Sequence, residues 1–335
     1  MSNQLADPLA VAEVSQRVLE ILHRYRRGNS FADVGDNRTI DGGSRARRLS
    51  TLEAKIERFI TCGQRVHFVI PAFPAKSPNR TKVLGELPDL GERISLGFLQ
   101  SICDYVGHFY RPGAYLTICS DGHVFGDVVG VSDRSVTAYR EQLTRLIEAE
   151  SWPSLGMFGL DDAFGSRDYP KLRTVLDRDY AVPIEDLKSR VRTDDHARSL
   201  FNGIQRFMFE DAVSMRGKEC SRTKLRNAAK ASAYHTILRS NAWSRVVADR
   251  FPDAIRLSVH PQAPHSEKFG IHLMRTGDQW LTPWHGVVLD DGENVSLVRR
   301  WEAEKIDATA VWRDGRPSHF VAPHLGIKSM KGLST

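Results

Sequence analysis

The sequence is poor in cysteine and has no long run of apolar residues. Its four cysteines, Cys62, Cys103, Cys119 and Cys220, show neither CxxC pairing nor regular spacing, which argues against a disulfide framework and a thiolate metal site. No stretch approaches the roughly 20 continuous apolar residues that cross a bilayer, and the first residues lack the layout of a secretory signal. We therefore expect free thiols, a cytoplasmic location and no membrane contact.

Motifs for bound nucleotides and metals are also missing. Neither G-x-G-x-x-G nor G-x-x-x-x-G-K followed by Ser or Thr occurs, so dinucleotide-binding and P-loop sites have little support. Four histidines, His260, His265, His272 and His285, lie close together in the sequence, but they lack HExxH spacing and no carboxylate completes the pattern. The sequence therefore predicts no metal site.

The charge balance does not indicate a particular partner. The net charge of +6 comes from 47 basic and 41 acidic residues among 335, and 41% apolar content is ordinary for a globular protein. Two basic clusters, residues 23–27 and 45–48, could meet nucleic acid, but neither is interleaved with aromatic residues for base stacking. We favour surface positions for both and expect no nucleic-acid partner, with nucleic-acid binding kept as an alternative function.

Apolar periodicity predicts alternating helices and strands along the first half of the chain. Helices are predicted over 9–27, 51–61, 92–110 and 132–150, and strands over 65–70, 115–119 and 155–160. On the third helix, the predicted buried residues are Ile94, Phe98, Ile102, Tyr105 and Phe109. The fourth helix is expected to be capped by Ser132 or Asp133. Its predicted buried residues are Val136, Tyr139, Leu143 and Leu146. Strand and helix alternation of this kind predicts a parallel sheet with helices on its faces.

The second half of the chain is predicted to contain long helices followed by short strands. Two long helices are predicted over 185–215 and 222–250, and short strands follow from residue 251. We therefore divide the chain into three parts. Residues 1–50 form an N-terminal helix and surface segment, 51–250 the α/β core, and 251–335 a strand-rich region that packs on the core and completes the active site.

Two loops that leave strand ends carry the first set of candidate residues. In an open parallel sheet, ligands bind outside the carboxyl ends of the strands. The loop 71–91 is stiffened by prolines, and cations on a stiff backbone lose less freedom when they bind an anion. Its cations Lys76, Arg80 and Lys82 are expected to face Asp121, His123 and Asp127 of the loop 119–131. The alternative is that these charges only hydrate a surface loop.

A second set lies on the C-terminal strands. Alternation puts Arg256, Ser258 and His260 on one face of a strand over 255–260. Lys268 and His272 share a face of the strand that follows. If the two strands pair, these side chains form one polar, cationic wall.

Five segments, in order, resemble the isocyanide (isonitrile) synthase family, also described as the pyoverdine/dityrosine biosynthesis family. They are PAFPAKSPNRTKVLGELPDLGE (71–92), GAYLTICSDGHVFGDVVGVSD (113–133), IRLSVHPQ (255–262), KFGIHL (268–273) and TPWHG (282–286). The resemblance spans roughly residues 60–290.

The resemblance implies an enzyme with a Rossmann-like fold, so that the sheet of residues 51–250 is a Rossmann-like, mostly parallel one. Such an enzyme builds an isocyano group on the amine of an aromatic L-amino acid, tyrosine or tryptophan, with C2 of ribulose 5-phosphate as the carbon donor. It implies no metal and no bound organic cofactor, and an iron- and 2-oxoglutarate-dependent oxygenase downstream in the pathway. The similar fungal dityrosine branch keeps an N-formyl product open as an alternative.

With this chemistry in view, each candidate receives a hypothesis. Lys76, Asp121, His123 and His260 are the predicted catalytic residues, with Asp121 and His123 as acid and base. The predicted substrate-binding residues are Arg80, Lys82, Asp127, Arg256, Lys268, Trp284 and His285. Lys76, Arg80 and Lys268 are assigned to phosphate or carboxylate, and His260 and His285 to the sugar hydroxyls. Structural alternatives remain: His123 can close a turn, Asp127 and Asp133 can be caps, and Trp284 can be a core anchor. Tyr105, Tyr139, Phe125 and Trp284 can stack on the substrate ring.

Overall fold

The computed structural model describes residues 8–27, 42–217, 219–262 and 266–323. It opens with two helices, α1 (Pro8–Arg24) and α2 (Gly42–Thr61). The first agrees with the sequence prediction. The second begins at Gly42 rather than near residue 51, because its first turns carry little apolar periodicity and are continuous with the packed turns that follow.

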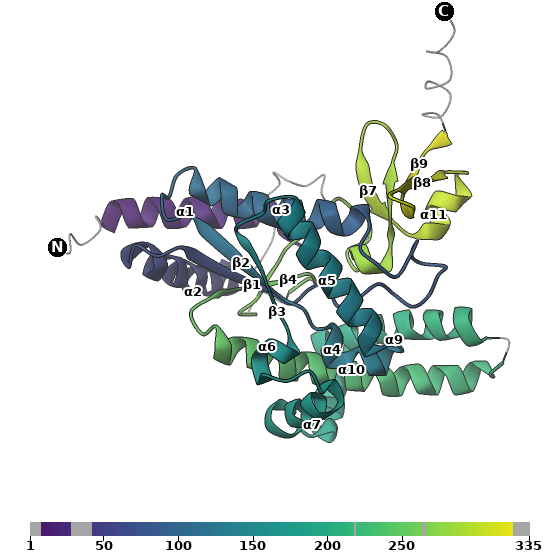
Figure 1. Cartoon of the computed structure of the whole chain (residues 1–335). Helices are drawn as coiled ribbons and strands as arrows, with labels where there is room; N and C mark the ends of the chain where they lie inside the picture. Colours follow the sequence, from purple (N-terminus) through teal and green to yellow (C-terminus); the bar gives the residue numbers. More distant parts are fainter. Residues whose placement is uncertain (1–7, 28–41, 218, 263–265, 324–335) are drawn as a thin grey trace, which may run out of the picture.

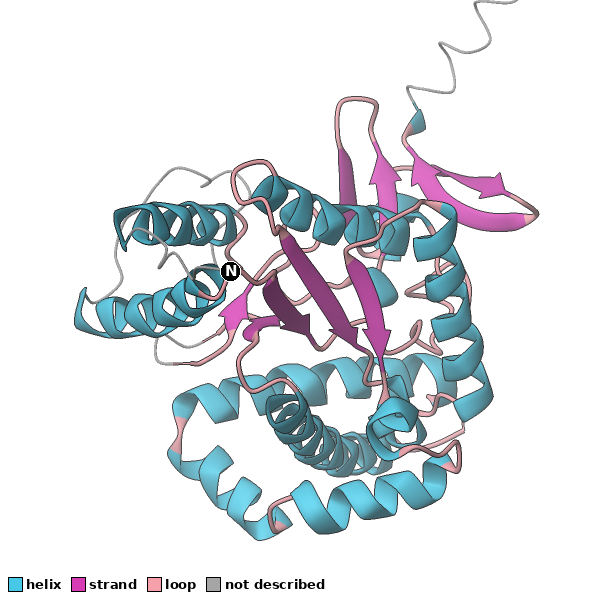
Figure 2. Ribbon diagram, turned by 60° about the vertical axis from the view of Figure 1, so that its left-hand side comes forward, coloured by secondary structure: helices cyan, strands magenta, loops and turns pink. Residues whose placement is uncertain are grey.

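The centre of the molecule is a five-stranded parallel sheet. Its strands are β1 (Val66–Ile70), β2 (Ala114–Cys119), β3 (Leu155–Phe158), β4 (Ile255–Ser258) and β5 (Phe269–Gly270). They lie in the order β3-β2-β1-β4-β5, and Figure 2 shows helices around this central sheet. This is the order of a Rossmann sheet without its sixth strand, so the prediction of a Rossmann-like parallel sheet is confirmed.

Helices occupy most of the chain between these strands. They are α3 (Leu90–Gly107), α4 (Gly122–Val129), α5 (Asp133–Ala149), α6 (Leu160–Phe164), α7 (Tyr169–Tyr180), α8 (Ile184–Thr193), α9 (Asp195–Arg216) and α10 (Arg222–Arg250). The prediction differs from the structure at four points: the expected loop 119–131 contains α4, the helix expected over 185–215 is two helices, and neither α6 nor α7 was predicted. The break before α9 is at Asp194, whose carboxylate accepts a hydrogen bond from the Ala197 amide at 2.6 Å.

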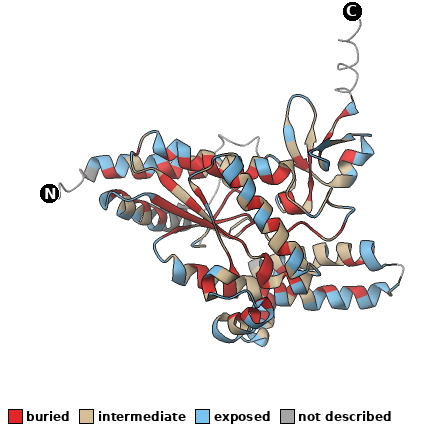
Figure 3. Cartoon of the chain, in the orientation of Figure 1, coloured by how far each residue is buried: buried red, intermediate tan, exposed pale blue. Residues whose placement is uncertain are grey.

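The two faces of the sheet are covered by different helices. Phe68 and Ile70 point into the core formed with α1, α2, α3 and α5, whereas Val69 points towards α7 and the second half of α10. Strand residues are accordingly buried on both faces (Figure 3). Because β1 has no polar face, its sequence VHFVI is nearly continuous in apolar residues.

The predicted buried face of α3 is partly wrong. Its buried apolar residues are Leu96, Leu99, Ile102, Cys103 and Val106. Ile94 and Phe98 are only partly buried and Tyr105 is 46% exposed. The helix packs against β2 on one side and against the C-terminal sheet near Ile94 on the other, so apolar residues occur around most of its circumference.

Helix α5 shows the predicted buried side. Val136, Tyr139 and Leu143 are buried, and Leu146 is partly buried. Its N-cap is Ser132, whose hydroxyl accepts a hydrogen bond from the Ser135 amide at 3.1 Å.

A second, smaller sheet lies at the C-terminal end (Figure 1). It contains β6 (Val287–Asp290), β7 (Val295–Val298), β8 (Thr309–Arg313) and β9 (Arg316–Val321), with α11 (Arg300–Lys305) between β7 and β8. The strand order is β7-β6-β9-β8. The expected strand-rich region is therefore present, but β4 and β5 within it belong to the larger sheet. None of the described helices is long and apolar enough to cross a membrane.

Candidate active site

A cavity of about 870 Å³ lies at the carboxyl ends of β1, β2 and β4. Strands β1 and β4 are neighbours, yet the chain leaves β1 towards β2 and β3 before it returns to β4. This is the point at which the strand order reverses, where open α/β sheets bind their ligands. Helices α8, α9 and α10 cover the cavity, and its volume lies within the usual range of small-molecule sites, about 300–1,000 Å³.

The loops after β1 and β2 touch each other beside this cavity. The Ser120 hydroxyl donates to the Phe73 carbonyl oxygen at 3.0 Å. A methyl group on Gly122 would lie 1.9 Å from the Pro74 carbonyl oxygen, so only glycine permits this approach. Phe73 is fully buried in a left-handed conformation with φ 56°. Packing thus holds the two loops together.

The cavity has a polar end and an apolar end. The polar residues lie at or near the ends of β2, β4 and β5 or on the middle of α10: Asp121, Ser240, Asn241, Ser244, Ser258, His260, Gln262 and Lys268. The apolar residues lie on the covering helices: Leu187, Val191, Leu200, Ile204, Phe207, Met208, Ala229 and Ile237. One cavity therefore offers hydrogen-bonding groups to a polar ligand and an apolar surface to an aromatic side chain.

Asp121 is the acidic group of the polar end. It precedes α4 without capping it, and its Oδ1 is buried with no hydrogen-bond partner among the described residues. Burial raises the pKa of this carboxyl from 3.8 to about 7, although its own amide and Lys268 oppose the shift. A carboxyl that titrates near neutral pH can both donate and accept a proton.

Asp121 also makes stability depend on pH. Because its pKa is higher in the folded chain, its contribution to stability is lost as pH rises from about 4 to about 7. We expect Asp121→Asn to match the parent near pH 4 and to exceed its free energy of unfolding near pH 8 by on the order of 1 kcal/mol or more. Urea unfolding at both pH values measures this, and a pH-independent difference would contradict it.

Cationic groups surround the rest of the polar end. Burial, and then the charge of Arg256, lower the pKa of Lys268 to about 8. Burial, with Arg27, His285 and Lys268, lowers the pKa of His260 to about 3, so this imidazole is neutral. The predicted cationic wall of β4 and β5 exists in part: Lys268 and His260 line the cavity, whereas Arg256 lies behind it and donates to the Ser244 carbonyl oxygen at 2.7 Å. His272 is buried away from the cavity lining.

Arg27 belongs to a cluster that the sequence placed on the surface. It is buried, and its guanidinium donates to the carbonyl oxygens of Gln279 at 2.7 Å and Leu281 at 2.8 Å. Tyr25 of the same cluster packs edge-on against Phe98 at 4.7 Å. The surface interpretation is therefore wrong for Arg27 and only partly right for Tyr25, which is partly buried, whereas Arg24 is exposed. The side chains of the cluster 45–48 lie outside the described residues.

Lys76 is not available to a substrate anion. It contributes to the cavity wall, but its Nζ contacts Asp89 Oδ2 at 2.7 Å, Glu92 Oε2 at 2.8 Å and the Pro283 carbonyl oxygen at 2.9 Å. Burial lowers its pKa, but the two carboxylates outweigh burial and hold the pKa above its ordinary value. The Tyr139 hydroxyl donates to Glu92 at 3.0 Å and completes the buried network. The geometry thus contradicts anion binding by Lys76.

Arg80 and Lys82 also form ion pairs with carboxylates of the protein. Arg80 forms an exposed ion pair with Glu86 and does not line the cavity. Lys82 contacts Asp211 at 2.8 Å and lies over the Phe207 ring at 4.9 Å. The expectation that these cations face Asp121, His123 and Asp127 is wrong, because acidic residues on the same loop and on α9 are closer.

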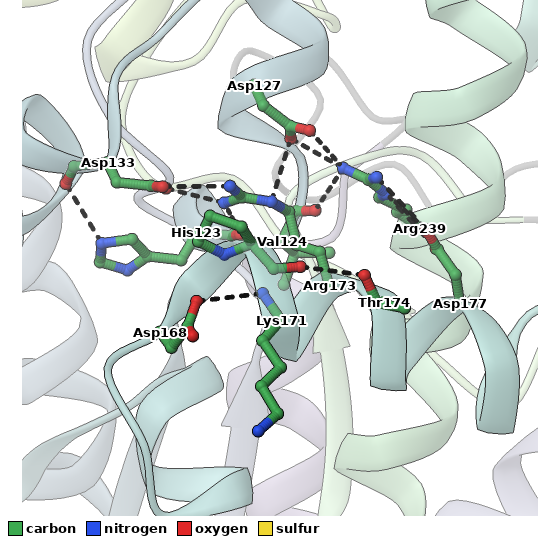
Figure 4. A network of polar contacts seen from close by, with 11 residues as sticks. His123, Val124, Asp127, Asp133, Asp168, Lys171, Arg173, Thr174, Asp177 and Arg239 are labelled. Carbon is green, nitrogen blue, oxygen red and sulfur yellow. Dashed lines mark hydrogen bonds and ion pairs between the residues drawn. The ribbon is translucent and has the colours of Figure 1, made fainter.

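His123 and Asp127 belong to a structural network (Figure 4). His123 is buried outside the cavity lining, stacked on Tyr169 at 3.6 Å, with Nε2 at 3.0 Å from Thr137 Oγ1. Asp127 borders the cavity but accepts hydrogen bonds from Arg239 of α10 at 2.7 and 2.9 Å. The predicted proton transfer by His123 therefore has no geometric basis.

A second arginine fixes the other side of this network. Arg173 of α7 donates to Asp133 at 2.7 and 3.0 Å and to the His123 carbonyl oxygen at 3.1 Å. The network thus binds α4, α5, α7 and α10 to one another, and Asp133 is an ion-pair partner rather than a cap.

Trp284 and His285 lie at the cavity wall as predicted. Trp284 is both wall and anchor, since its ring packs 5.3 Å from Phe73 within the core. Burial lowers the pKa of His285 to about 4, and its Nδ1 lies 3.1 Å from Thr282 Oγ1. Of the other proposed stacking residues, Phe125 lines the cavity, whereas Tyr105 and Tyr139 do not.

Sequence reasoning predicted helices over most of the covering segment but named none of their residues as site residues. Phe207, Met208, Ser240, Asn241 and Ser244 line the cavity from α9 and α10. Gln262, at the end of the segment IRLSVHPQ, was also missed as a site residue. Within the described ranges, no group of three or more His, Cys, Asp or Glu side chains could hold a metal ion.

Comparison with known proteins agrees with this fold. The model of the family described as "Pyoverdine/dityrosine biosynthesis protein" matches residues 56–311. The chain is 45% identical over 307 residues to the L-tryptophan isonitrile synthase AmbI2 of Fischerella ambigua, covering 92% of this chain and 91% of that protein. It is 40% identical over 324 residues to an L-tyrosine isonitrile synthase of Pseudomonas aeruginosa, covering 95% and 96%.

A solved structure extends the similarity to three dimensions. The crystal structure of the PvcA protein from Pseudomonas aeruginosa matches with a TM-score of 0.84 at 39% identity, covering 92% of this chain and 99% of that chain. The family match spans the five segments noted in the sequence and the strands that carry the cavity. The chain therefore belongs to the pyoverdine/dityrosine biosynthesis family and is an enzyme of its isocyanide (isonitrile) synthase group.

Proposed function

We propose that this enzyme converts the amino group of an aromatic L-amino acid to an isocyano group, with ribulose 5-phosphate as carbon donor and no further cofactor. The observation that carries the proposal is the division of one cavity into a cationic polar end and an apolar end. The relatives named above act on tryptophan and tyrosine, which supports an aromatic amino acid as the second substrate.

The polar end suits a sugar phosphate. Lys268 lines it, the charge of Arg256 acts on Lys268 from behind the cavity wall, and Arg27 acts electrostatically on His260. Burial depresses the pKa of Arg256, and burial together with the charge of Arg256 depresses the pKa of Lys268, so an entering dianion relieves an unfavourable arrangement of charge. Hydroxyl and amide groups of Ser240, Asn241 and Gln262 can hydrogen-bond the sugar hydroxyls.

The apolar end suits the aromatic side chain. Ile204, Phe207 and Met208 of α9 face Ala229 and Ile237 of α10 across this part of the cavity. An indole or phenol ring placed there buries its surface against aliphatic and thioether groups, which favours binding by the hydrophobic effect. The amine of the substrate then lies towards Asp121 and His260.

The first chemical step needs groups that move protons. Condensation of the amine with the C2 ketone requires a neutral amine, and it releases the ketone oxygen as water. Asp121, which titrates near neutral pH, is the proposed acid and base. The neutral imidazole of His260 is the proposed hydrogen-bond partner of the sugar hydroxyls.

Product analysis tests the proposal. The purified protein is incubated with L-tryptophan, L-tyrosine or L-phenylalanine and ribulose 5-phosphate labelled with carbon-13 at C2, with ribose 5-phosphate as the matched aldose control. We expect a labelled isocyanide, trapped with a tetrazine, from the ketose alone. An N-formyl product, heavier by one water, would instead support the alternative. An unlabelled product or none would overturn the carbon donor.

The apolar end gives a separate prediction. Ala229→Phe fills it, so we expect the KM of the amino acid to rise about tenfold or more. The KM of ribulose 5-phosphate should stay within about twofold, because the polar end is unchanged. Ala231→Phe, two residues further along α10 on its exposed side, is the matched control. Steady-state kinetics for both substrates measure this, and equal KM changes in the two variants would contradict it.

A further inference from the structure

We propose that Lys268 forms a Schiff base with C2 of the ketose phosphate and passes this carbon to the amine of the amino acid. The inference rests on the proposed function, since it requires a ketone substrate in the polar end of the cavity. It assigns the lysine to covalent catalysis rather than to electrostatic binding of phosphate.

Three lysines near the cavity differ in their partners. Lys76 is held by two carboxylates and a carbonyl oxygen, and Lys82 by Asp211. Lys268 lines the cavity, and its ammonium group makes no hydrogen bond or ion pair with any described residue. A paired lysine stays protonated, whereas an amine without a carboxylate partner can lose its proton and act as a nucleophile.

The charged groups around Lys268 favour its neutral form. Leu257 pairs with Phe269 in parallel register, so Arg256 lies beside Lys268 on the neighbouring strand and on the same face of the sheet. Its guanidinium disfavours a second positive charge. Asp121 and Glu267 act in the opposite direction, but Glu267 is exposed to solvent and Asp121 is only partly ionised near neutral pH. Burial, and then the charge of Arg256, lower the pKa of Lys268 to about 8, and at that pH a substantial fraction of the amine is neutral.

An acidic group lies in the same end of the cavity as Lys268. Asp121 lines the same end of the cavity and acts electrostatically on Lys268. In the step, the Lys268 nitrogen adds to C2 and the ketone oxygen takes a proton from Asp121. The nitrogen then loses a proton, a second proton reaches the hydroxyl, water leaves, and a C=N bond forms. No electrons are gained or lost.

The substrate amine completes the exchange. It adds to the same carbon, and the Lys268 nitrogen leaves as a neutral amine after proton transfer from the incoming nitrogen through Asp121. The product is the Schiff base of the amino acid with the sugar, and Lys268 is regenerated. A protonated Schiff base is more electrophilic than a ketone, which gives the exchange its advantage over direct condensation.

Reductive trapping tests the inference. The protein is incubated with ribulose 5-phosphate and sodium cyanoborohydride without amino acid, digested, and mapped by mass spectrometry. We expect the reduced sugar adduct on Lys268. Lys268→Arg keeps the charge but should lose the adduct and at least about a hundredfold of kcat. Lys230→Arg, an exposed position on α10, should keep both.

The outcomes separate this inference from the proposed function. Isocyanide formation from ribulose 5-phosphate without an adduct on Lys268, or with an adduct on another lysine only, would overturn the Schiff base and leave the proposed function standing. Absence of both product and adduct would overturn both. Trapping on wild-type Lys268 does not depend on a variant, so a folding defect in Lys268→Arg cannot imitate either result.

Discussion

Replacing Lys76 with methionine is expected to lower the free energy of unfolding by about 3–5 kcal/mol. The lysine is fully buried and compensates the charge of Asp89 and Glu92, which are themselves buried. Methionine has a similar length but leaves the carboxylates without a counter-ion and the Pro283 carbonyl oxygen without a donor. Burial already raises the pKa of Asp89 to about 7, and loss of the ammonium raises it further.

Urea unfolding measures this effect. Arg80→Met is the matched control, because its ion pair with Glu86 lies on the surface and its loss should cost no more than about 0.5–1 kcal/mol. The triple variant Lys76→Met, Asp89→Asn, Glu92→Gln removes the uncompensated charges and should regain part of the loss. Near-parent stability of Lys76→Met would show that Lys76 does not hold these carboxylates and would restore it as a candidate for substrate binding.

This network also connects stability with the site. Lys76 binds the Pro283 carbonyl oxygen, and the Ser77 amide donates to the Trp284 carbonyl oxygen at 2.9 Å. The loop after β1 is therefore fixed to the turn that carries Trp284 and His285. Since both line the cavity, Lys76 is a positioning residue, and its loss would disturb the cavity wall as well as the fold.

The parallel sheet could be predicted because its signals are local. β1 and β2 are short apolar runs bounded by turn residues, and the periodic helices between them require crossover connections, hence parallel strands. The place of the cavity followed from the same reasoning, since ligands bind where such strands end. Asp121 was proposed in this way, because it comes after a recognisable strand. His260 and Lys268 were proposed from the alternation of side chains on the C-terminal strands, and all three residues line the cavity.

The partners of the loop cations could not be predicted because they depend on packing between distant segments. Lys82 binds Asp211 on α9, far along the chain. For Lys76 a signal was present: Asp89 and Glu92 have the spacing of a capping box, which places two carboxylates at the start of α3. Recognition of that box would have offered Lys76 a protein partner before a substrate one.

The covering helices were harder for another reason. Residues of α9 that line the cavity look like ordinary members of an amphipathic face, and periodicity alone cannot separate core from cavity. Helix α10 has almost no amphipathic pattern, so its sequence does not indicate which residues face the cavity. For His123 the error is the opposite one: it was proposed as a site residue but does not line the cavity. Its position after a strand end suggested chemistry, but helix α4 turns the ring towards Tyr169 and Thr137.

Replacing Asp121 with asparagine is expected to reduce kcat by about 10²–10⁴-fold, the usual contribution of a positioned acid or base. Asparagine keeps the shape of the side chain but cannot exchange a proton near neutral pH. The KM values for both substrates should change little, because the lost interaction belongs to the transition state. Product formation under saturating substrates measures this.

The comparison with His123→Gln separates the structural argument from the sequence hypothesis. Both residues were predicted acid and base groups, but only Asp121 lines the cavity. We expect His123→Gln to retain kcat within about tenfold at a temperature well below its unfolding transition, since its loss acts through packing with Tyr169. Asp121→Asn should be the more stable of the two near pH 8, because it removes a buried carboxylate. An inactive protein that is more stable than its parent cannot owe its defect to unfolding, whereas an active Asp121→Asn variant would remove this carboxyl from the mechanism.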